Sequence, residues 1–361
     1  MNKEKLLDRP GFRLGAASVL CAAAGLFLGF LVLLIIEPKE AGIAMGTMLQ
    51  NFAYFPRADV ALEYFGTTLV QTCPLAICAF SVIYARKAGL FNIGASGQFA
   101  AGACAALYLA LKCGMPWWVC LPAGMLAGAV IGAASGAFKA YRNVNEVISG
   151  IMLNWIVLYP VNMILTEVAD SNTYTLDISL YAPSALLPGL GLDRLFAGND
   201  TVTIALPLTV LLAFGVNFVL KRTRLGFETR AVGFNPSAAS LSGMDEKKNM
   251  VLTMAIAGAL SGLAAGFCYL CGLESWQCSL TTVPAIGFDA IAAAFLGVLD
   301  PLGAFVASYF VSHIRAGSFH IDRTVYPEEI ASLIIAITIY ASAFAAYISS
   351  RLAPKAGGDV K

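Results

Sequence analysis

The sequence has little charge and very few histidines, and each scarcity excludes a class of protein. Charged residues make up 12% of the 361 positions, about half of the share in an average soluble domain, whereas hydrophobic residues reach 58%. The net charge of +1 argues against a protein that binds nucleic acid through a basic surface. This composition is typical of a chain that is surrounded by membrane lipid.

The short motifs of nucleotide binding and of hydrolysis are also missing. No Gly-Lys dipeptide occurs anywhere, so the chain has no P-loop for ATP. Its two histidines, His313 and His320, do not form H-E-x-x-H, and no G-x-S-x-G elbow is present. We therefore expect that the chain is not an enzyme, has no catalytic residues and holds no metal or cofactor of its own.

Nine cysteines are present, but most lie in apolar runs, where cysteine behaves as a small hydrophobic residue. Cys268 and Cys271 have the C-x-x-C spacing of redox and metal motifs, yet they lie inside an expected spanning helix without a second pair nearby. A packing role is favoured for them. The sequence leaves open whether a disulfide joins two of the cysteines near the outer surface, which are Cys113, Cys120, Cys271 and Cys278.

Long apolar segments predict an all-α membrane protein with about ten spanning helices, because a helix needs about 20 mainly apolar residues to cross the bilayer. The expected spans are 14–36, 64–85, 92–111, 116–138, 147–166, 201–220, 251–272, 283–299, 302–316 and 330–350. The third, eighth and ninth are short, glycine-rich or interrupted, so the sequence does not fix their boundaries. The first run is longer than the core of a signal peptide and has no small-x-small cleavage site, so we expect a retained span.

The distribution of positive charge predicts the orientation. With the N-terminus inside, 17 of the 23 Lys and Arg residues fall on the cytoplasmic side, which is a clear positive-inside bias. Both termini are then cytoplasmic, and the expected location is the cytoplasmic (inner) membrane of a bacterium. We expect one transmembrane domain over residues 1–361, with an external loop at 167–200 and a cytoplasmic loop at 221–250.

Two glycine-aromatic segments lie at matching places in the two halves of the chain. Gly89–Gly94 reads Gly-Leu-Phe-Asn-Ile-Gly, and 287–290 reads Gly-Phe-Asp-Ala. Glycine-interrupted segments in corresponding positions of two halves are the best sequence indication of a transporter's binding site. They suggest an inverted repeat of two five-helix halves.

The cytoplasmic loop 221–250 contains a helix signal of its own. Asn235 and Pro236 are a favourable cap and first residue, and they precede the small residues Ser237–Gly243. One interpretation is a solvated, positively charged loop. The other is a short docking helix that a separate ATPase approaches closely.

Several motifs together resemble one family. Residues 223–239 (TRLGFETRAVGFNPSAA) are similar to the coupling segment of ABC importer permeases of the branched-chain amino acid, ribose and simple-sugar superfamily. Further segments resemble the nucleoside and simple-sugar branch of this superfamily. They are 89–98 (GLFNIGASGQ), 145–149 (NEVIS) followed by 152–154 (MLN), 287–293 (GFDAIAA) and 299–303 (LDPLG). The family usually has an acidic residue where this chain has Ser96, which weakens a charge-based role at that position.

The resemblance implies the partners of such a permease. They are a second homologous permease, which leaves homodimer and heterodimer open, an ABC ATPase subunit that binds ATP and Mg, and an external substrate-binding protein or lipoprotein. Contact with the ATPase is expected at Gly226, Glu228, Arg230, Gly233, Asn235, Pro236, Ala238, Ala239 and Gly243. Glu274 and Trp276 are expected at the external mouth, where a delivering protein docks, although Trp276 also suits an interfacial aromatic belt.

Polar and aromatic residues inside the expected spans are candidates for the substrate pathway. These are Phe91, Asn92, Ser96, Gln98, Asn154, Phe288, Asp289 and Phe295. An ionisable residue in a span, such as Asp289, is costly and therefore a functional candidate. The alternatives are an ion pair at a helix end for Asp289, interhelical hydrogen bonds for the amides, and packing or lipid contact for the aromatic rings.

The expected function is therefore an importer permease for a small polar solute, with a nucleoside first, riboflavin second and a simple sugar third. An ion-coupled secondary transporter is the alternative from another class. It needs no ATPase, so the loop 221–250 argues against it. A structural or receptor protein is disfavoured because a scaffold gains nothing from glycine-interrupted spans.

Overall fold

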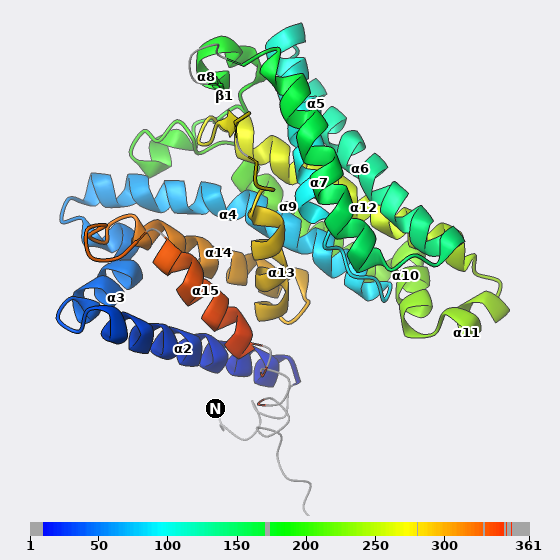
Figure 1. Ribbon diagram of the computed structural model, residues 1–361, viewed down its shortest axis with the longest axis horizontal. Coiled ribbons are helices and arrows are strands. Elements are labelled where there is room, and N and C mark those ends of the chain that lie inside the picture. The colour runs from blue at the N-terminus through cyan, green and yellow to red at the C-terminus, as the bar shows by residue number, and fades with distance from the viewer. Residues whose placement is uncertain are drawn as a thin grey trace, which may run out of the picture.

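The computed structural model describes residues 10–169, 174–279, 281–327, 329–342, 344 and 348. Within these residues the chain is a bundle of helices with a single two-stranded sheet (Figure 1). The polytopic all-α architecture expected from the sequence is confirmed.

Each of the ten expected spans contains a helix. They are α2 (Pro10–Ile36), α4 (Ala58–Lys87), α5 (Ala95–Cys113), α6 (Trp117–Arg142), α7 (Glu146–Thr166), α9 (Ala205–Arg222), α12 (Glu246–Tyr269), α13 (Ile286–Leu296), α14 (Pro301–Ser318) and α15 (Glu329–Ser342). Among the described residues, six are long and apolar enough to cross a membrane: α2, α4, α6, α7, α9 and α12. The other four include the three spans whose boundaries the sequence did not fix. Most of 343–350, the end of the last expected span, lies outside the described residues.

Several short elements connect these helices. On the external side they are α3 (Ala41–Gln50), η1 (Asn51–Tyr54), β1 (Thr175–Leu176), α8 (Ile178–Tyr181), η2 (Pro183–Ala185), η3 (Asp193–Phe196) and β2 (Trp276–Gln277). On the cytoplasmic side, α10 (Arg224–Phe234) and α11 (Pro236–Leu241) form the loop 221–250. Helices α3 and α10 were not expected from the sequence. Both are short, and α10 carries too many polar residues to read as a span.

Contacts between loops agree with the expected sidedness. Strands β1 and β2 pair antiparallel, which joins the two loops expected outside. At the other end Lys221 forms a 3.1 Å ion pair with Asp300, joining two turns expected in the cytoplasm. In Figure 1, α10 and α11 project at the lower right, far from α8 and β1 at the top.

Glycines allow a close backbone contact between α6 and α12. A Cβ atom added at Gly128 or Gly132 would collide with backbone carbonyl oxygens of α12, and one added at Gly258 or Gly262 would collide with those of α6. The two backbones therefore touch directly, as small residues at a four-residue spacing permit in membrane helices.

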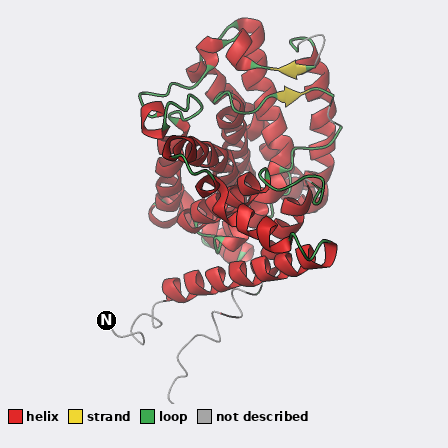
Figure 2. Ribbon diagram, turned by 90° about the vertical axis from the view of Figure 1, so that its left-hand side faces the viewer, coloured by secondary structure: helices red, strands yellow, loops and turns green. Residues whose placement is uncertain are grey.

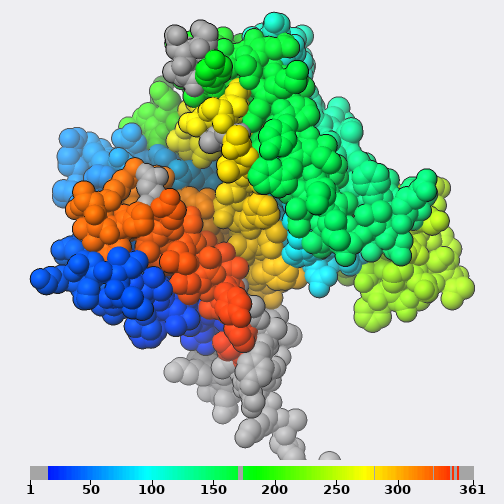
Figure 3. Space-filling view, viewed as in Figure 1, coloured from blue at the N-terminus to red at the C-terminus, as the bar shows by residue number. Residues whose placement is uncertain are grey.

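Helices α13 and α2 each leave one face at the surface of this bundle. Helix α13 runs between α7 on one side and α14 and α15 on the other, and its outward face is uncovered (Figure 3). Helix α2 lies as a long rod along one side, opposite the two strands (Figure 2). Gly25 and Gly29 hold α2 against α15, because a Cβ atom at either position would collide with Thr338 or press against Ile334.

Candidate functional site

A cavity of about 530 Å³ lies between helices in the external half of the bundle. Its walls come from α4, α5, α7, α12, α13 and α14, and its rim comes from the loop that contains β2. A volume of this size falls in the range of small-molecule sites. Its aromatic side chains include Phe99, Tyr269 and Trp276, and its polar ones include Gln71, Glu274, Ser312 and Arg315.

Three aromatic rings form one continuous wall of the cavity. The ring centroids of Phe99 and Tyr269 lie 5.8 Å apart, and those of Tyr269 and Trp276 lie 5.7 Å apart in an edge-to-face arrangement. The indole N–H of Trp276 donates to the side-chain oxygen of Asn162 at 2.9 Å, which fixes this ring. Such a wall suits a flat, partly apolar solute. Phe99 and Tyr269 were not among the residues that the sequence singled out.

Gln71 supplies an amide to the same cavity. Its side-chain oxygen is buried and has no hydrogen-bond partner in the part of the chain that the structure describes. An unsatisfied buried acceptor costs about 1–3 kcal/mol, so a donor group on a solute is favoured there. The sequence analysis did not select Gln71, although a glutamine in the middle of the expected span 64–85 was a usable signal.

Asp289 forms an ion pair with Arg315. The carboxylate in the first turn of α13 accepts from the guanidinium in the last turn of α14 at 2.7 Å, and the two side chains are 18% and 35% exposed. Arg315 also lines the cavity, whereas Asp289 does not. Asp289 is therefore an acid paired at a helix end, outside the cavity wall.

Asn92 and Gln98 are fully buried beside the cavity and bonded to each other. Their amide groups exchange two hydrogen bonds of 2.8 and 3.0 Å. Asn92 also donates to Ser81 on α4, and Ser81 accepts from Ser261 on α12. The network joins α4, α5 and α12, and neither amide lines the cavity in this structure. Interhelical hydrogen bonding accounts for both side chains.

Asn154 joins α7 to the start of α5. Its side-chain oxygen accepts from the backbone N–H of Gly97 at 2.8 Å, and its nitrogen donates to the Ile93 carbonyl at 3.0 Å. The first N–H groups of a helix have no partner within the helix, so this side chain satisfies one of them. A Cβ atom on Gly97 would lie 2.8 Å from the Asn154 Cα, which explains the glycine.

Ser96, two residues after the first glycine-aromatic segment, contacts the second one. Its hydroxyl donates to the Pro284 carbonyl at 2.9 Å, and a Cβ atom on Gly287 would collide with the Ser96 hydroxyl oxygen. The first turns of α5 and α13 therefore pack directly against each other. The inverted repeat itself stays a prediction.

The three candidate phenylalanines lie outside the cavity. Phe91 and Phe295 contact each other with ring centroids 6.2 Å apart. Phe288 and Phe295 are exposed on α13, the helix whose outward face Figure 3 shows uncovered. Their surface is available to lipid or to a neighbouring subunit.

The two residues expected to dock a delivering protein differ in their surroundings. Glu274 is exposed at the rim, where it accepts from the Cys268 thiol at 3.1 Å. Trp276 is only 4% exposed and belongs to the cavity wall. Docking at Glu274 stays a prediction, and Trp276 offers little free surface for it.

The cytoplasmic loop contains the short helix that its sequence predicts. The Asn235 side chain caps α11 by accepting from the Ala238 N–H at 3.1 Å, and Pro236 is the first helical residue. Gly243 ends it with φ +84°, because the Met244 N–H bonds to the Ala239 carbonyl and the Gly243 N–H to that of Ser240. This closure requires a left-handed residue, which favours glycine.

Charged residues fix the ends of this loop. Glu228 accepts from Arg224 at 2.7 Å along α10, and the Arg230 guanidinium donates to the Gly226 carbonyl at 3.3 Å. At the start of α12, the backbone N–H of Lys248 and its ammonium hydrogen-bond to Asp245 and lower the pKa of that exposed carboxyl group.

Two glycines attach α10 rigidly to the bundle. A Cβ atom on Gly226 would collide with the Val219 carbonyl of α9, and one on Gly233 would collide with the Lys87 carbonyl at the end of α4. The second contact places α10 directly against Gly89, the start of the first glycine-aromatic segment. A displacement of α10 therefore reaches the turn between α4 and α5 without an intervening flexible link.

Two large apolar residues at α10 and α11 face away from the chain. Phe234 is 94% exposed and Leu241 is 91% exposed. Isolated exposed apolar residues are ordinary, so these two side chains are only candidates for a contact with another protein. The sequence analysis did not select either of them.

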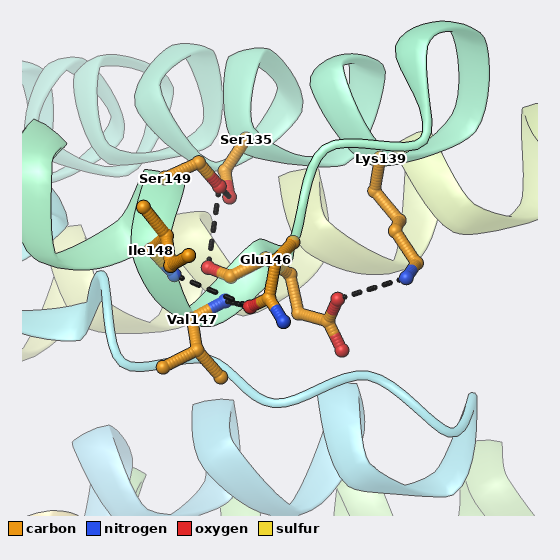
Figure 4. Close-up of polar contacts among 7 residues, drawn as sticks. Ser135, Lys139, Glu146, Val147, Ile148 and Ser149 are labelled. Carbon is orange, nitrogen blue, oxygen red and sulfur yellow. Dashed lines mark hydrogen bonds and ion pairs between the residues drawn. The ribbon is translucent and has the colours of Figure 1, made fainter.

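The turn between α6 and α7 leads into a capped helix start. Asn145 caps α7 by accepting from the N–H groups of Val147 and Ile148. Figure 4 shows Lys139 and Glu146 pointing toward each other across this turn, at 3.1 Å. Glu146 lies in the first turn of α7, where an acidic side chain is favoured by the helix dipole.

All nine cysteines are free in this structure, so none of the disulfides that the sequence left open is formed. Within the described ranges, no group of three or more His, Cys, Asp or Glu residues is arranged to hold a metal ion.

The chain matches the family model described as "Branched-chain amino acid transport system / permease component" over residues 64–343. The nucleoside ABC transporter permease protein NupB of Lactococcus lactis is 32% identical over 287 residues, 76% of this chain and 78% of that protein. The guanosine ABC transporter permease protein NupP of Bacillus subtilis is 31% identical over 284 residues, 77% of this chain and 80% of that protein.

The glucose ABC transporter permease protein TsgB13 of Haloferax volcanii is 28% identical over 359 residues, 94% of this chain and 90% of that protein. No solved structure matches the chain. Because the family match covers most of the chain and the first two relatives are similar over more than two thirds of it, the chain belongs to the family of permease components of branched-chain amino acid transport systems, which are membrane transport proteins and not enzymes.

Proposed function

We propose that this chain is the membrane-spanning permease subunit of an ABC importer and that its solute is a nucleoside. The names of two relatives specify nucleoside and guanosine permeases, and a third specifies a glucose permease. The external cavity carries the choice of a nucleoside, because an aromatic wall and a few polar groups face the same space.

The two parts of a nucleoside match two parts of the cavity. A flat base stacks on aromatic side chains, which contributes about 1–3 kcal/mol per base in nucleic-acid complexes, and Phe99, Tyr269 and Trp276 provide such rings. Ribose hydroxyls donate and accept hydrogen bonds, and Gln71 and Ser312 provide partners. A simple sugar has hydroxyl groups for the second set of groups but no aromatic base to stack on the first.

The remaining subunits follow from the same proposal. A separate ABC ATPase binds ATP and Mg and docks on α10 and α11 through the exposed side chains of Phe234 and Leu241. A second homologous permease covers the open face of α13. An external binding protein or lipoprotein delivers the solute at the rim near Glu274, and the complex lies in the cytoplasmic membrane of a bacterium.

The helix contacts supply a route for coupling. A movement of α11 is passed to α10, and Gly233 of α10 pushes on the backbone at Lys87. The next residues form the turn to α5, where Asn92 and Gln98 hold α4, α5 and α12 together. Breaking this network opens the cavity toward the cytoplasm. ATP hydrolysis in the partner ATPase thereby determines the side from which the solute reaches the cavity.

The test uses the reconstituted complex in liposomes, with Gln71→Leu compared with Gln50→Leu, a matched control on the exposed end of α3. We expect Gln71→Leu to raise the KM for guanosine by roughly three- to tenfold, the effect of losing one hydrogen bond of about 0.5–1.5 kcal/mol. Gln50→Leu leaves the KM unchanged.

Competing solutes separate the two parts of the proposal. If glucose or riboflavin inhibits uptake and nucleosides do not, the proposal of a nucleoside substrate is contradicted, while the proposal of an ABC importer still holds. Uptake that continues without ATP contradicts the importer.

A further inference from the structure

A second cavity, of about 910 Å³, lies between α2 and the turn that joins α13 to α14. Its lining is mainly apolar and comes from both helices, with Val19, Ala22 and Leu26 on α2 and Val306 and Phe310 on α14. Helix α2 is held against α15 by Gly25, so its other face is free to form this wall. Val19 and Val306 are exposed, so the cavity is open at the surface of the bundle.

The cavity has the length of one membrane leaflet. On α2 its lining begins at Gly15 and ends at Leu26, a helical rise of roughly 17 Å at 1.5 Å per residue. The hydrocarbon core of a bilayer is about 30 Å thick, so this length corresponds to about half of it. Gly15 follows the basic N-terminal segment, and the cavity therefore occupies the cytoplasmic half of the membrane.

The cytoplasmic end of the cavity carries an excess of positive charge. Lys87 and Asp300 both line it, and Lys221 and Arg230 lie within electrostatic range of Lys87. The Asp300 carboxylate is already engaged, since it pairs with Lys221 at 3.1 Å and accepts from two N–H groups at the start of α14. Among the described residues the Lys87 ammonium forms no ion pair within 4 Å. Three cations thus face one anion.

A polar atom in the wall also lacks a partner. The Ser18 hydroxyl on α2 is buried and makes no hydrogen bond within the described ranges, and Ser18 lines the cavity less than one helical turn from Gly15. The hydroxyl and the ammonium at the cytoplasmic end of the cavity suit the polar headgroup of a lipid, and the apolar remainder of the cavity suits its acyl chain.

We propose that this cavity binds an anionic phospholipid of the cytoplasmic leaflet. An acyl chain lies between α2 and α14, and the phosphate headgroup contacts Lys87 and Ser18. Negative headgroups are attracted to basic residues near the membrane surface, whereas a zwitterionic headgroup brings a second cation into a region that already has an excess of them.

The test measures lipid bound to the purified full-length chain. The protein is offered equal amounts of phosphatidylglycerol and phosphatidylcholine in detergent micelles, and native mass spectrometry counts the molecules retained. We expect about a fivefold preference for phosphatidylglycerol, in keeping with one cation near the headgroup. Lys87→Gln removes this preference, and Arg86→Gln, which deletes the neighbouring exposed cation, preserves it.

A second variant tests the apolar part of the cavity. Ala22→Trp fills the channel and is expected to release both lipids while the protein stays monodisperse. Equal retention of the two lipids by the unmodified chain, or an unchanged preference in Lys87→Gln, overturns the proposal. Phosphatidylglycerol retained by Ala22→Trp also overturns it. The proposal is also overturned if the unmodified chain retains neither lipid and Val306→Cys cross-links to a partner permease. In that case a protein, and not a lipid, fills the cavity.

Discussion

Single polar residues in a membrane span have two uses, and the sequence alone does not separate them. Asn92 and Gln98 are conspicuous in the sequence, yet both are fully buried and bonded to each other. Their network ends at Ser261, which lies 180 positions from Ser81 and is an ordinary serine in the sequence. Gln71, which was not a candidate from the sequence, lines the cavity instead. The distinction depends on partners from distant helices, and no local pattern contains them.

The ion pair of Asp289 and Arg315 gives a prediction at the residue scale. Asp289→Asn removes the counter-charge of an arginine in the cavity wall, so we expect slower solute uptake and a loss of about 1 kcal/mol of stability, reduced by the partial exposure of the pair. Thermal unfolding and uptake measure the two effects. Asp200→Asn, which neutralises an exposed external acid, is the control.

A double variant separates loss of the pair from loss of the acid alone. Asp289→Asn combined with Arg315→Gln should recover stability, because no unpaired charge remains. If Asp289→Asn alone leaves both stability and uptake unchanged, the pair has no role in holding the cavity wall.

At the scale of elements, the sequence predicted the long helices well and the short ones poorly. Spans such as 147–166 are recognisable from length and hydrophobicity alone, and they contain the expected helices. Helix α3 is only ten residues long, and α10 is a polar helix whose position depends on Gly226 and Gly233 packing against other backbones. Close backbone contacts of this kind depend on tertiary structure. The glycines in the sequence indicate that such contacts exist, but they do not show which helix is the partner.

The contact between α6 and α12 gives a prediction at this scale. Gly258→Ala places a methyl group against the Gly128 carbonyl, so we expect a loss of about 1–3 kcal/mol from overpacking. Gly215→Ala is the control on α9, where a Cβ atom meets nothing within 4 Å, and its higher helix propensity is expected to preserve stability or raise it slightly. Equal melting temperatures of the two variants would contradict the close contact.

The exposed apolar residues of the cytoplasmic loop give a second prediction for an element. Phe234→Ser with Leu241→Ser removes two side chains that the ATPase is proposed to bury, and we expect its affinity to fall at least about tenfold. Co-purification and titration of the ATPase measure this change. Leu195→Ser, at an exposed apolar residue of η3 on the external side, should have no effect. Unchanged affinity in the double variant would move the docking surface elsewhere.

At the scale of the whole molecule, the orientation follows from charge and agrees with the contacts. The positive-inside bias places 167–200 outside and 221–250 inside, and strand pairing and the Lys221–Asp300 ion pair each join loops of one side only. The external cavity and the cytoplasmic docking loop thus lie at opposite ends of one bundle.

The measurement that tests the central claim most directly is uptake of labelled guanosine by liposomes containing this chain with its ATPase, second permease and binding protein. We predict uptake that requires hydrolysable ATP on the side of α10 and α11 and that does not occur with an ion gradient alone. If instead this chain alone moves guanosine down an ion gradient and ATP has no effect, it is a secondary transporter and the importer account is wrong.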